Sequence, residues 1–228
     1  NVSGARQWTR QFGAVSTALS PGGLAHDAAG NVLVVGGTPV GLDGNTLVGT
    51  TDGFVTKYNS AGAKQWTRQR GLSGGTRAAY YVTADSQDNI YVTGRRTSGF
   101  LNGTQIGVID SFLDKYDSGG TLQWEKEFGN PTNHVAEPRW VAHDGDGNIY
   151  VAGMATAGFD GAANIGAVDY YLIKFNPTGV KQWSKSLSAP NKGTYGGAVS
   201  CDQSGNAFLT FYSNAGLDGN TLIGTNAG

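Results

Sequence analysis

The sequence predicts an all-β protein built from four tandem repeats, and two observations lead to this prediction. A Gln-Trp pair recurs every 58 or 59 residues, and each pair follows a turn of the form Asn/Asp-x-x-Gly. The composition agrees, because 37 glycines, 6 prolines and abundant aromatic residues describe a folded chain with many turns. A fixed period of this kind identifies a repeat architecture. The paired tryptophans are Trp8, Trp66, Trp124 and Trp183.

Each repeat is predicted to hold four short strands. An Asp-rich turn, such as residues 144–148, separates a first strand from a second, because the Asp side chain accepts backbone N–H bonds within a tight turn. A long loop, a third strand such as residues 54–58, and the tryptophan strand follow. Four antiparallel strands per repeat predict a β-propeller blade. The alternative, a β-solenoid, is disfavoured because nothing repeats at the shorter period of its coils.

Three motifs occur in a fixed order along the repeat. They are Asp-x-x-Gly-Asn-x-Tyr-Val-x-Gly at residues 144–153, Asp-x-Phe-x-x-Lys-Tyr at 52–58 and Asn-x-x-Gly-x-x-Gln-Trp at 59–66. This order resembles the bacterial SBBP repeat, or beta-propeller repeat, family over the whole chain. The resemblance implies a secreted or cell-surface bacterial protein and carries no family-wide catalytic residue. One departure is Phe211, which stands where the other repeats have Gly36, Gly94 and Gly153.

The repeats are predicted to form one domain, residues 1–228, in units of about 13–70, 71–128, 129–187 and 188–228 plus 1–12. Residues 1–12 are expected to supply the outer strand of the last blade. The equivalent of residues 54–58 is missing from that blade. The alternative is that the chain is a segment of a larger propeller. Unpaired strand edges recruit other chains, so self-association through the incomplete blade is expected.

Charge and cysteine content exclude several classes of function. A formal net charge of −1 without runs of like charge gives no electrostatic basis for binding nucleic acid or an anionic membrane. No apolar stretch approaches the roughly 20 residues that span a bilayer. Cys201 is the single cysteine, so an intramolecular disulfide framework is excluded. No cofactor is expected, and the expected partner is a protein or a glycan.

Two metal hypotheses arise from the repeat, and both are weak. His26, His143 and Cys201 occupy the same place in three first strands, and their ligand types suit zinc. Simple packing of strand residues is favoured for them. The Asp-rich turn of the third repeat has alternating oxygen ligands, but Ala155 stands where a calcium loop needs a bidentate Glu.

Residues that differ between repeats are free to bind a ligand, whereas residues shared by all repeats serve the blade. The connections between blades differ most, and they lie on the loop-rich face of the predicted propeller. Their aromatic and polar residues suit recognition of a sugar or a peptide. The expected function is therefore a non-enzymatic binding or adhesion scaffold at the cell surface. The candidate ligand contacts are Arg77, Tyr80, Tyr81, His134, Glu137, Arg139, Trp140, Lys192 and Tyr195.

Two alternatives remain. A lectin with one site per blade predicts that recurrent loop residues, such as Asp43, Asn45 and Asp218, touch the ligand. A hydrolase or lyase is third, because the sequence contains no Gly-x-Ser-x-Gly elbow, phosphate loop or zinc-protease motif.

Overall fold

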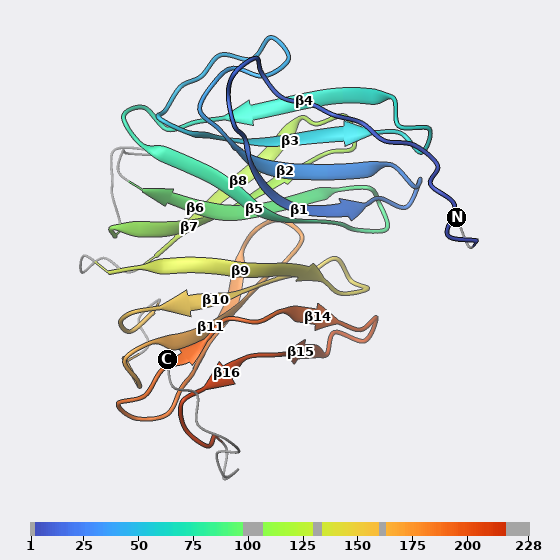
Figure 1. The fold of residues 1–228 in the computed structure, drawn as a ribbon. Helices are drawn as coiled ribbons and strands as arrows, with labels where there is room; N and C mark the ends of the chain where they lie inside the picture. The colour runs from blue at the N-terminus through green and yellow to red at the C-terminus, as the bar shows by residue number, and fades with distance from the viewer. Residues whose placement is uncertain (1–2, 98–106, 130–133, 160–162, 218–228) are drawn as a thin grey trace.

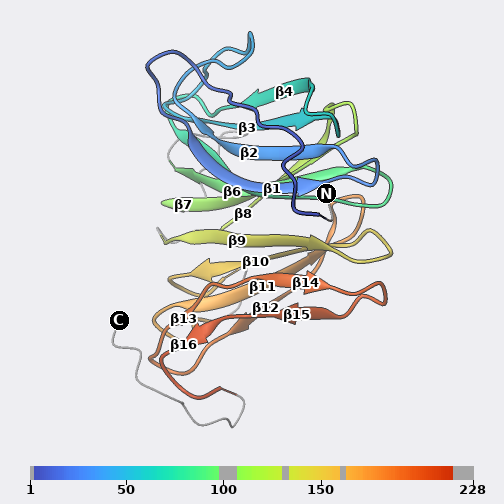
Figure 2. The same cartoon turned by 45° about the vertical axis from the view of Figure 1, so that its right-hand side comes forward.

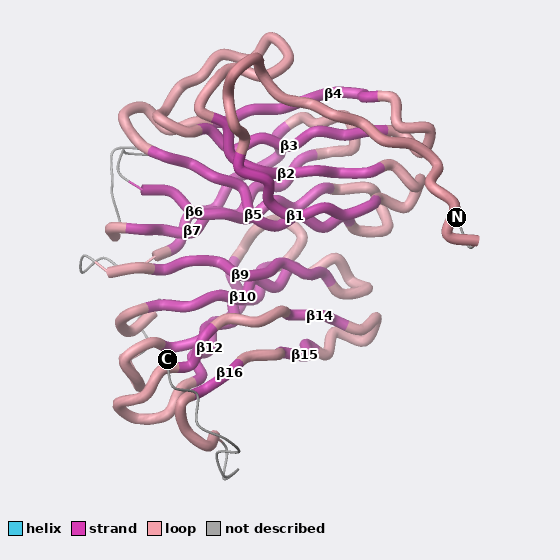
Figure 3. Tube along the Cα trace, in the orientation of Figure 1, coloured by secondary structure: helices cyan, strands magenta, loops and turns pink. Residues whose placement is uncertain are grey.

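The chain forms a series of antiparallel β-sheets that follow one another like blades (Figures 1 and 3). The computed structural model describes residues 3–97, 107–129, 134–159 and 163–217. Throughout these residues the regular structure consists of strands alone. Within the same residues, no helix has the length and apolar character that a membrane crossing requires. The prediction of an all-β propeller of four-stranded blades is confirmed.

Three blades are complete, and each has the strand order first-second-third-fourth from one edge to the other. The first blade comprises β1 (Ser20–His26), β2 (Val32–Thr38), β3 (Asp52–Tyr58) and β4 (Lys64–Arg70). The second comprises β5 (Thr76–Ala84), β6 (Ile90–Thr97), β7 (Ile109–Tyr116) and β8 (Leu122–Phe128). The third comprises β9 (Ala136–His143), β10 (Ile149–Ala155), β11 (Asp169–Phe175) and β12 (Lys181–Leu187).

The fourth blade is interrupted. Its first strand is split into β13 (Thr194–Tyr195) and β14 (Val199–Cys201), and its second strand into β15 (Ala207–Leu209) and β16 (Tyr212–Ser213). β14 pairs with β15, and β13 pairs with β16. The first strands β1, β5, β9 and β14 contact one another in this order, so they form the inner surface of the arrangement (Figure 2).

The hydrophobic core lies between the faces of neighbouring blades. Leu33 and Val35 of the first blade pack in one cluster with Val82 and Ile90 of the second. A sheet that is covered on both faces must be apolar on both, which explains why every residue of β3 is buried. The blades therefore depend on one another for their burial.

The tryptophans of the repeat join each blade to the next. The indole Nε1 atoms of Trp8, Trp66 and Trp124 donate to backbone carbonyl oxygens 52 or 53 residues further along the chain. The acceptors are Ser60 at 2.9 Å, Ser118 at 3.4 Å and Pro177 at 3.3 Å, each in the turn before the next fourth strand. We call this contact the tryptophan latch. It agrees with the prediction that residues shared by all repeats serve the blade.

The N-terminal segment uses the same latch on the first blade. Beside the Trp8 contact, Arg10 Nε donates to the carbonyl oxygen of Gly62 at 2.7 Å. The described part of this segment therefore packs at the first blade, at the opposite end of the series from β14 and β15 (Figure 1). The closing strand that the sequence suggested for the last blade is not seen there.

Candidate functional site

A backbone bulge recurs in the first strand of each complete blade. Against the second strand, the register shifts between Pro21 and Leu24 in β1 and between Ala79 and Tyr81 in β5. In β9 the shift leaves Arg139 as the extra residue, between the Pro138–Gly153 and Trp140–Ala152 pairs. A bulge of this kind re-aims a side chain away from the regular pleat. The bulged positions carry Gly22 and Gly23, Tyr80 and Arg139, so the same device presents a different side chain in each blade.

A glycine opposite the bulge makes room for it. A Cβ atom on Gly94 would lie 2.0 Å from the carbonyl oxygen of Ala78, and one on Gly153 would lie 2.4 Å from that of Glu137. Real Cβ atoms do not approach backbone this closely, so these positions require glycine. Gly36 is equally restricted by Ser20. The glycine that recurs in the sequence is therefore the partner of the bulge.

Phe211 explains the interruption of the fourth blade. It occupies the position of the required glycine, and there the strands separate into β13/β16 and β14/β15. Its ring packs on Tyr170, with centroids 5.7 Å apart. The separation falls at Gly196 and Gly197 in the first strand. The one departure noticed in the sequence thus opens the last blade.

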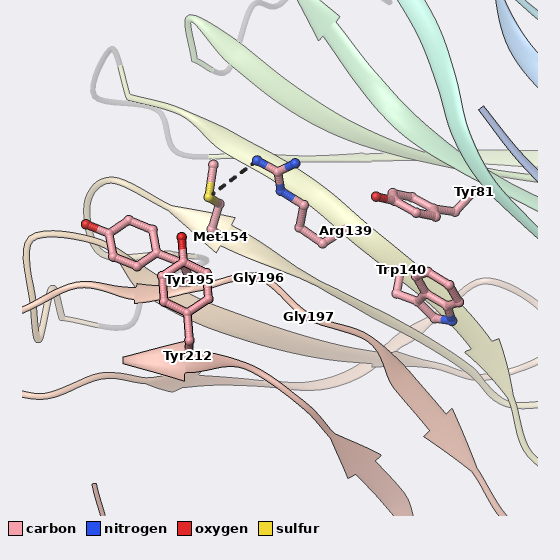
Figure 4. A pocket seen from close by; sticks show the side chains of 8 residues that line it. All are labelled: Tyr81, Arg139, Trp140, Met154, Tyr195, Gly196, Gly197 and Tyr212. Carbon is pink, nitrogen blue, oxygen red and sulfur yellow. Dashed lines mark hydrogen bonds between the residues drawn. The ribbon is translucent and has the colours of Figure 1, made fainter. Parts of the chain in front are cut away.

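An open cavity of about 440 Å³ lies beside this interruption. Arg139 lies in its middle, between two aromatic pairs (Figure 4). On one side are Tyr81 and Trp140, with ring centroids 5.2 Å apart. On the other are Tyr195 and Tyr212, which stack at 5.1 Å. The lining residues are Tyr81, Arg139, Trp140, Met154, Tyr195, Gly196, Gly197 and Tyr212.

A second cavity of about 440 Å³ continues the first along the inner surface. The two share Tyr81 and Arg139. The second adds Tyr80, Glu137 and the glycine bulge of β1 at residues 21–23. Together they form a groove, which we call the inner groove, across the first strands of four blades.

The charges of the inner groove form a chain of ion pairs. Glu137 accepts from Arg139 Nη2 at 3.1 Å and lies 3.6 Å from Arg95 Nη1. The Arg95 guanidinium lies over the Tyr80 ring, 5.7 Å from its centroid. Burial raises the pKa of the Tyr80 hydroxyl above its ordinary value. One carboxylate therefore stands between two guanidinium groups, and the cluster carries a net positive charge.

Six of the nine candidate ligand contacts come together in the inner groove, and three lie elsewhere. Arg77 is buried and donates to Asp114 at 2.7 and 2.8 Å and to Glu125 at 2.9 Å, so it is not accessible to a ligand. His134 and Lys192 do not line the cavities described above; their backbone carbonyls accept from Val108 and Ala167. The six that meet are Tyr80, Tyr81, Glu137, Arg139, Trp140 and Tyr195.

The structure does not assemble the proposed metal ligands. His143 and Cys201 line one cavity of about 500 Å³, but His26 does not line it. His143 Nδ1 lies 3.2 Å from Thr83 Oγ1, and burial raises the pKa of the Cys201 thiol to about 12. Within the described residues, no three His, Cys, Asp or Glu side chains are grouped to hold a metal ion.

The recurrent loop residues Asp43 and Asn45 make hydrogen bonds and an ion pair within the protein. Asp43 accepts from Lys64 Nζ and from Thr67 Oγ1 at 2.5 Å, and Asn45 Nδ2 donates to the carbonyl oxygen of Leu42 at 2.7 Å. Asp218 lies outside the described residues. These contacts do not favour a ligand site that repeats in every blade.

Sequence reasoning missed Met154, Tyr212 and the paired glycines Gly196 and Gly197. Met154 Sδ lies 3.7 Å from Arg139 Nη2 (Figure 4). Tyr212 and the two glycines could have been found from the sequence, because Phe211 replaces the repeated glycine next to Tyr212. A substitution opposite a bulge marks the place where the sheet separates.

Comparison with solved structures shows only distant resemblance. A protein of unknown function from Bacteroides caccae aligns with a TM-score of 0.47 and 12% identity, over 92% of this chain and 61% of that one. A polysaccharide lyase, an ulvan lyase bound to -[GlcA(1-4)Rha3S]-, aligns with a TM-score of 0.47 and 17% identity, over 84% of this chain and 50% of that one. This chain therefore spans part of each protein.

One finding corrects the functional expectation. The expected non-enzymatic scaffold does not fit neighbours that include a lyase, and we withdraw that interpretation. A curated relative, an uncharacterized WD repeat-containing protein of Acanthamoeba polyphaga mimivirus, is 26% identical over 181 residues, which cover 60% of this chain and 13% of that protein.

The family comparison agrees with the motif order and with the blades. The model of the SBBP beta-propeller repeat matches residues 7–40 and 123–160, which contain the first two strands of the first and third blades. Two regions of the chain are therefore similar to the SBBP beta-propeller repeat.

Proposed function

We propose that the inner groove binds an acidic polysaccharide. The observation that carries the proposal is the position of Arg139, raised on a bulge between two aromatic pairs. A guanidinium group binds a carboxylate or a sulfate through two parallel hydrogen bonds. Aromatic rings offer flat apolar surfaces on which the apolar faces of sugar rings pack. A cation flanked by such surfaces suits a polysaccharide in which a charged sugar lies between two other sugar rings.

The size and shape of the groove support a chain rather than a single sugar. The two cavities of about 440 Å³ share Tyr81 and Arg139, and each falls within the usual volume of a ligand site. Trp140 is 42% exposed although it adjoins the core of its blade, so its ring is available to a ligand. An open groove with an exposed aromatic floor accepts a polymer that extends beyond both ends.

The charge distribution favours a locally charged ligand. Arg139 in the groove and Arg95, which approaches Glu137 from beside it, outweigh that one carboxylate, while the whole chain has a formal net charge of −1. Binding of nucleic acid depends on many Lys and Arg contacts to successive phosphates. A single cationic cluster matches widely spaced carboxylates or sulfates better than a continuous polyphosphate.

A second candidate function is cleavage of the same polymer by β-elimination. The observation that favours it is that a guanidinium group and tyrosine hydroxyls line one cavity. In this reaction a base takes the proton from C5 of a uronate, the C4–O4 bond breaks, a C4–C5 double bond forms, and the departing oxygen takes a proton. Arg139 would neutralise the uronate carboxylate, and a tyrosine of the groove would exchange the protons.

The proposal extends to location. Acidic polysaccharides are components of cell surfaces and their surroundings, so the protein would act as a secreted or cell-surface bacterial protein. The SBBP repeats support this location through the family resemblance.

The test is a panel of polymers examined by affinity electrophoresis. Polygalacturonate, alginate and heparin are the acidic probes, dextran is the neutral control, and oligo-deoxythymidine is the control for a polyanion with stacking bases. Retardation by at least one acidic polysaccharide, and not by dextran or the oligonucleotide, is expected. Equal retardation by the oligonucleotide, or none by any polysaccharide, would contradict the proposal. Ultraviolet absorbance of an unsaturated product separates cleavage from binding.

A further inference from the structure

A third cavity adjoins the inner groove at Trp140. It has a volume of about 500 Å³ and lies between the first strands of the third and fourth blades. Trp140 lines both this cavity and the first cavity of the inner groove, at the end away from Tyr195 and Tyr212 (Figure 4). We call the third cavity the neutral cavity. Its polar lining residues are Thr83, His143, Ser200, Cys201 and Gln203, and apart from Trp140 the others are alanine and valine.

The neutral cavity differs from the inner groove in charge. The groove has the guanidinium group of Arg139 in its middle, whereas no Lys, Arg, Asp or Glu lines the neutral cavity. The Cys201 thiol is uncharged at neutral pH, because burial raises its pKa to about 12 and the charges of Asp144 and Asp202 add to this rise. The inner surface therefore changes from cationic to uncharged on the two sides of Trp140.

The polar groups of the neutral cavity suit an uncharged sugar. Ser200 and Gln203 are exposed, and within the described residues their side chains make no hydrogen bond. The His143 ring is oriented by Thr83, whose Oγ1 lies 3.2 Å from Nδ1. A hydroxyl and an amide each donate and accept, which matches the hydroxyl and acetamido groups of sugars. A carboxylate only accepts, and its removal from water is costly without a counter-charge.

The spacing along β9 separates two sugar sites. Trp140 and His143 stand three residues apart in the regular part of this strand, which corresponds to about 10 Å. This distance is longer than one sugar ring. The Trp140 side chain, 42% exposed, lies between the cationic and the uncharged parts. Sugars on its two sides therefore meet different chemistry.

We propose that the groove and the neutral cavity together select an alternating polysaccharide, in which each acidic sugar is followed by an uncharged one. This inference rests on the proposed function and names its ligand class more narrowly. The acidic sugar lies at Arg139, and its uncharged neighbour lies beyond Trp140, where Ser200 and Gln203 bind its polar groups. A polymer with a carboxylate on every sugar would bring one of them into the neutral cavity without a cation to bind it.

Calorimetric titrations at pH 8, above the range in which histidine usually titrates, test the inference. The alternating probes are the hexasaccharides of hyaluronan and of unsulfated chondroitin, in which glucuronate alternates with an uncharged N-acetylated sugar. Hexagalacturonate is the probe with a charge on every ring. At least one alternating hexasaccharide is expected to bind at least tenfold tighter than hexagalacturonate. Attraction by net charge alone predicts the opposite order, because the alternating probes carry half the charge.

A new cation in the neutral cavity should remove this preference. Gln203→Lys is expected to tighten the binding of hexagalacturonate at least fivefold, because it supplies the missing counter-charge. Ser200→Lys replaces it if circular dichroism shows that Gln203→Lys does not fold. Gln87→Lys is the matched control, since it adds the same charge at an exposed position in the turn between β5 and β6, outside these cavities, and should leave the preference unchanged.

The outcomes separate this inference from the proposed function. If neither alternating hexasaccharide binds tighter than hexagalacturonate, or if the preference survives a lysine at position 203 or 200 in a folded variant, the inference is overturned. The proposed function then still stands on the polymers that the panel retards. If no acidic saccharide binds in either experiment, the proposed function falls, and this inference falls with it.

Discussion

The indole nitrogen of Trp124 lies 3.3 Å from the carbonyl oxygen of Pro177, 53 residues further along the chain. The contact joins the fourth strand of one blade to a turn of the next. Trp66 makes the same contact with Ser118. The contact spans slightly less than the repeat period of 58 or 59 residues, because the acceptor turn lies just before the next tryptophan.

The first prediction compares Trp66, which is latched, with Trp183, for which no latch is seen within the described residues. Trp66→Ala should lower the free energy of unfolding by about 2 to 3 kcal/mol, somewhat less than for a fully buried aromatic residue, because Trp66 is only half-buried. Trp183→Ala should cost less than about 1 kcal/mol, because its ring is 36% exposed. Urea titrations of the two variants measure both values. Equal losses would show that the latch adds nothing to the burial of the ring.

The second prediction concerns the glycine opposite the bulge. Gly94→Ala should destabilise by at least about 2 kcal/mol, because the new methyl group meets the backbone of Ala78. Gly119→Ala is the control, since the nearest atom to its Cβ lies 3.4 Å away, and it should change stability by less than about 0.5 kcal/mol. Thermal melts of both variants check this difference. A Gly94→Ala variant as stable as the control would mean that the bulge can relax.

The third prediction concerns the buried charges of the second blade. Asp114 is fully buried and holds Arg77, so Asp114→Ala leaves the guanidinium with Glu125 as its remaining carboxylate partner. We expect a loss of about 3 kcal/mol, in the range for breaking a buried ion pair. Asp146→Asn, on an exposed turn, is the control and should be nearly neutral. If denaturant titrations give the same small loss for both, Arg77 has other partners that suffice.

The fourth prediction is a pH dependence at Glu127. Burial raises the pKa of this carboxyl to about 7, against the opposing effect of Arg96, and Glu125 adds to the rise. The folded state therefore holds the proton more tightly than the unfolded state, in which the pKa is about 4.5. This contribution to stability is fully present below pH 4.5 and is lost as the pH rises to about 7.

Glu127→Gln tests that dependence. Between pH 5 and pH 8 the stability of the wild-type chain should fall by about 2 kcal/mol relative to the variant. Unfolding titrations at the two pH values give the difference. Parallel pH profiles for the two proteins would show that Glu127 does not titrate as described.

The strands and their order were predictable because the same sequence pattern occurs in each of the four repeats. A turn such as residues 144–148, and the third strand at 54–58, recur with so little change that internal comparison identifies them. The bulges were not predictable, because the bulged residue differs in every blade. Only the glycine opposite the bulge recurs, because a side chain at that position would collide with the backbone of the neighbouring strand.

Part of the candidate site was predictable for the same reason. Tyr80, Arg139 and Trp140 differ between repeats, and the structure brings them together. Arg77 differs as well, yet it is buried against Asp114 and Glu125, which stand 37 and 48 residues away in the sequence. Variation between repeats identifies residues that the blade does not require. It does not distinguish a ligand contact from an ion pair that occurs in one blade only.

The most direct measurement is a calorimetric titration of the chain with the acidic oligosaccharide that the panel shows to bind most tightly. Arg139→Gln is compared with Lys192→Gln, which loses the same charge at an exposed position outside the inner groove. Arg139→Gln should raise the dissociation constant at least tenfold, which corresponds to about 1.4 kcal/mol, while Lys192→Gln should leave it within about twofold. Equal weakening by both variants would show that binding follows net charge, and would contradict a site built around Arg139.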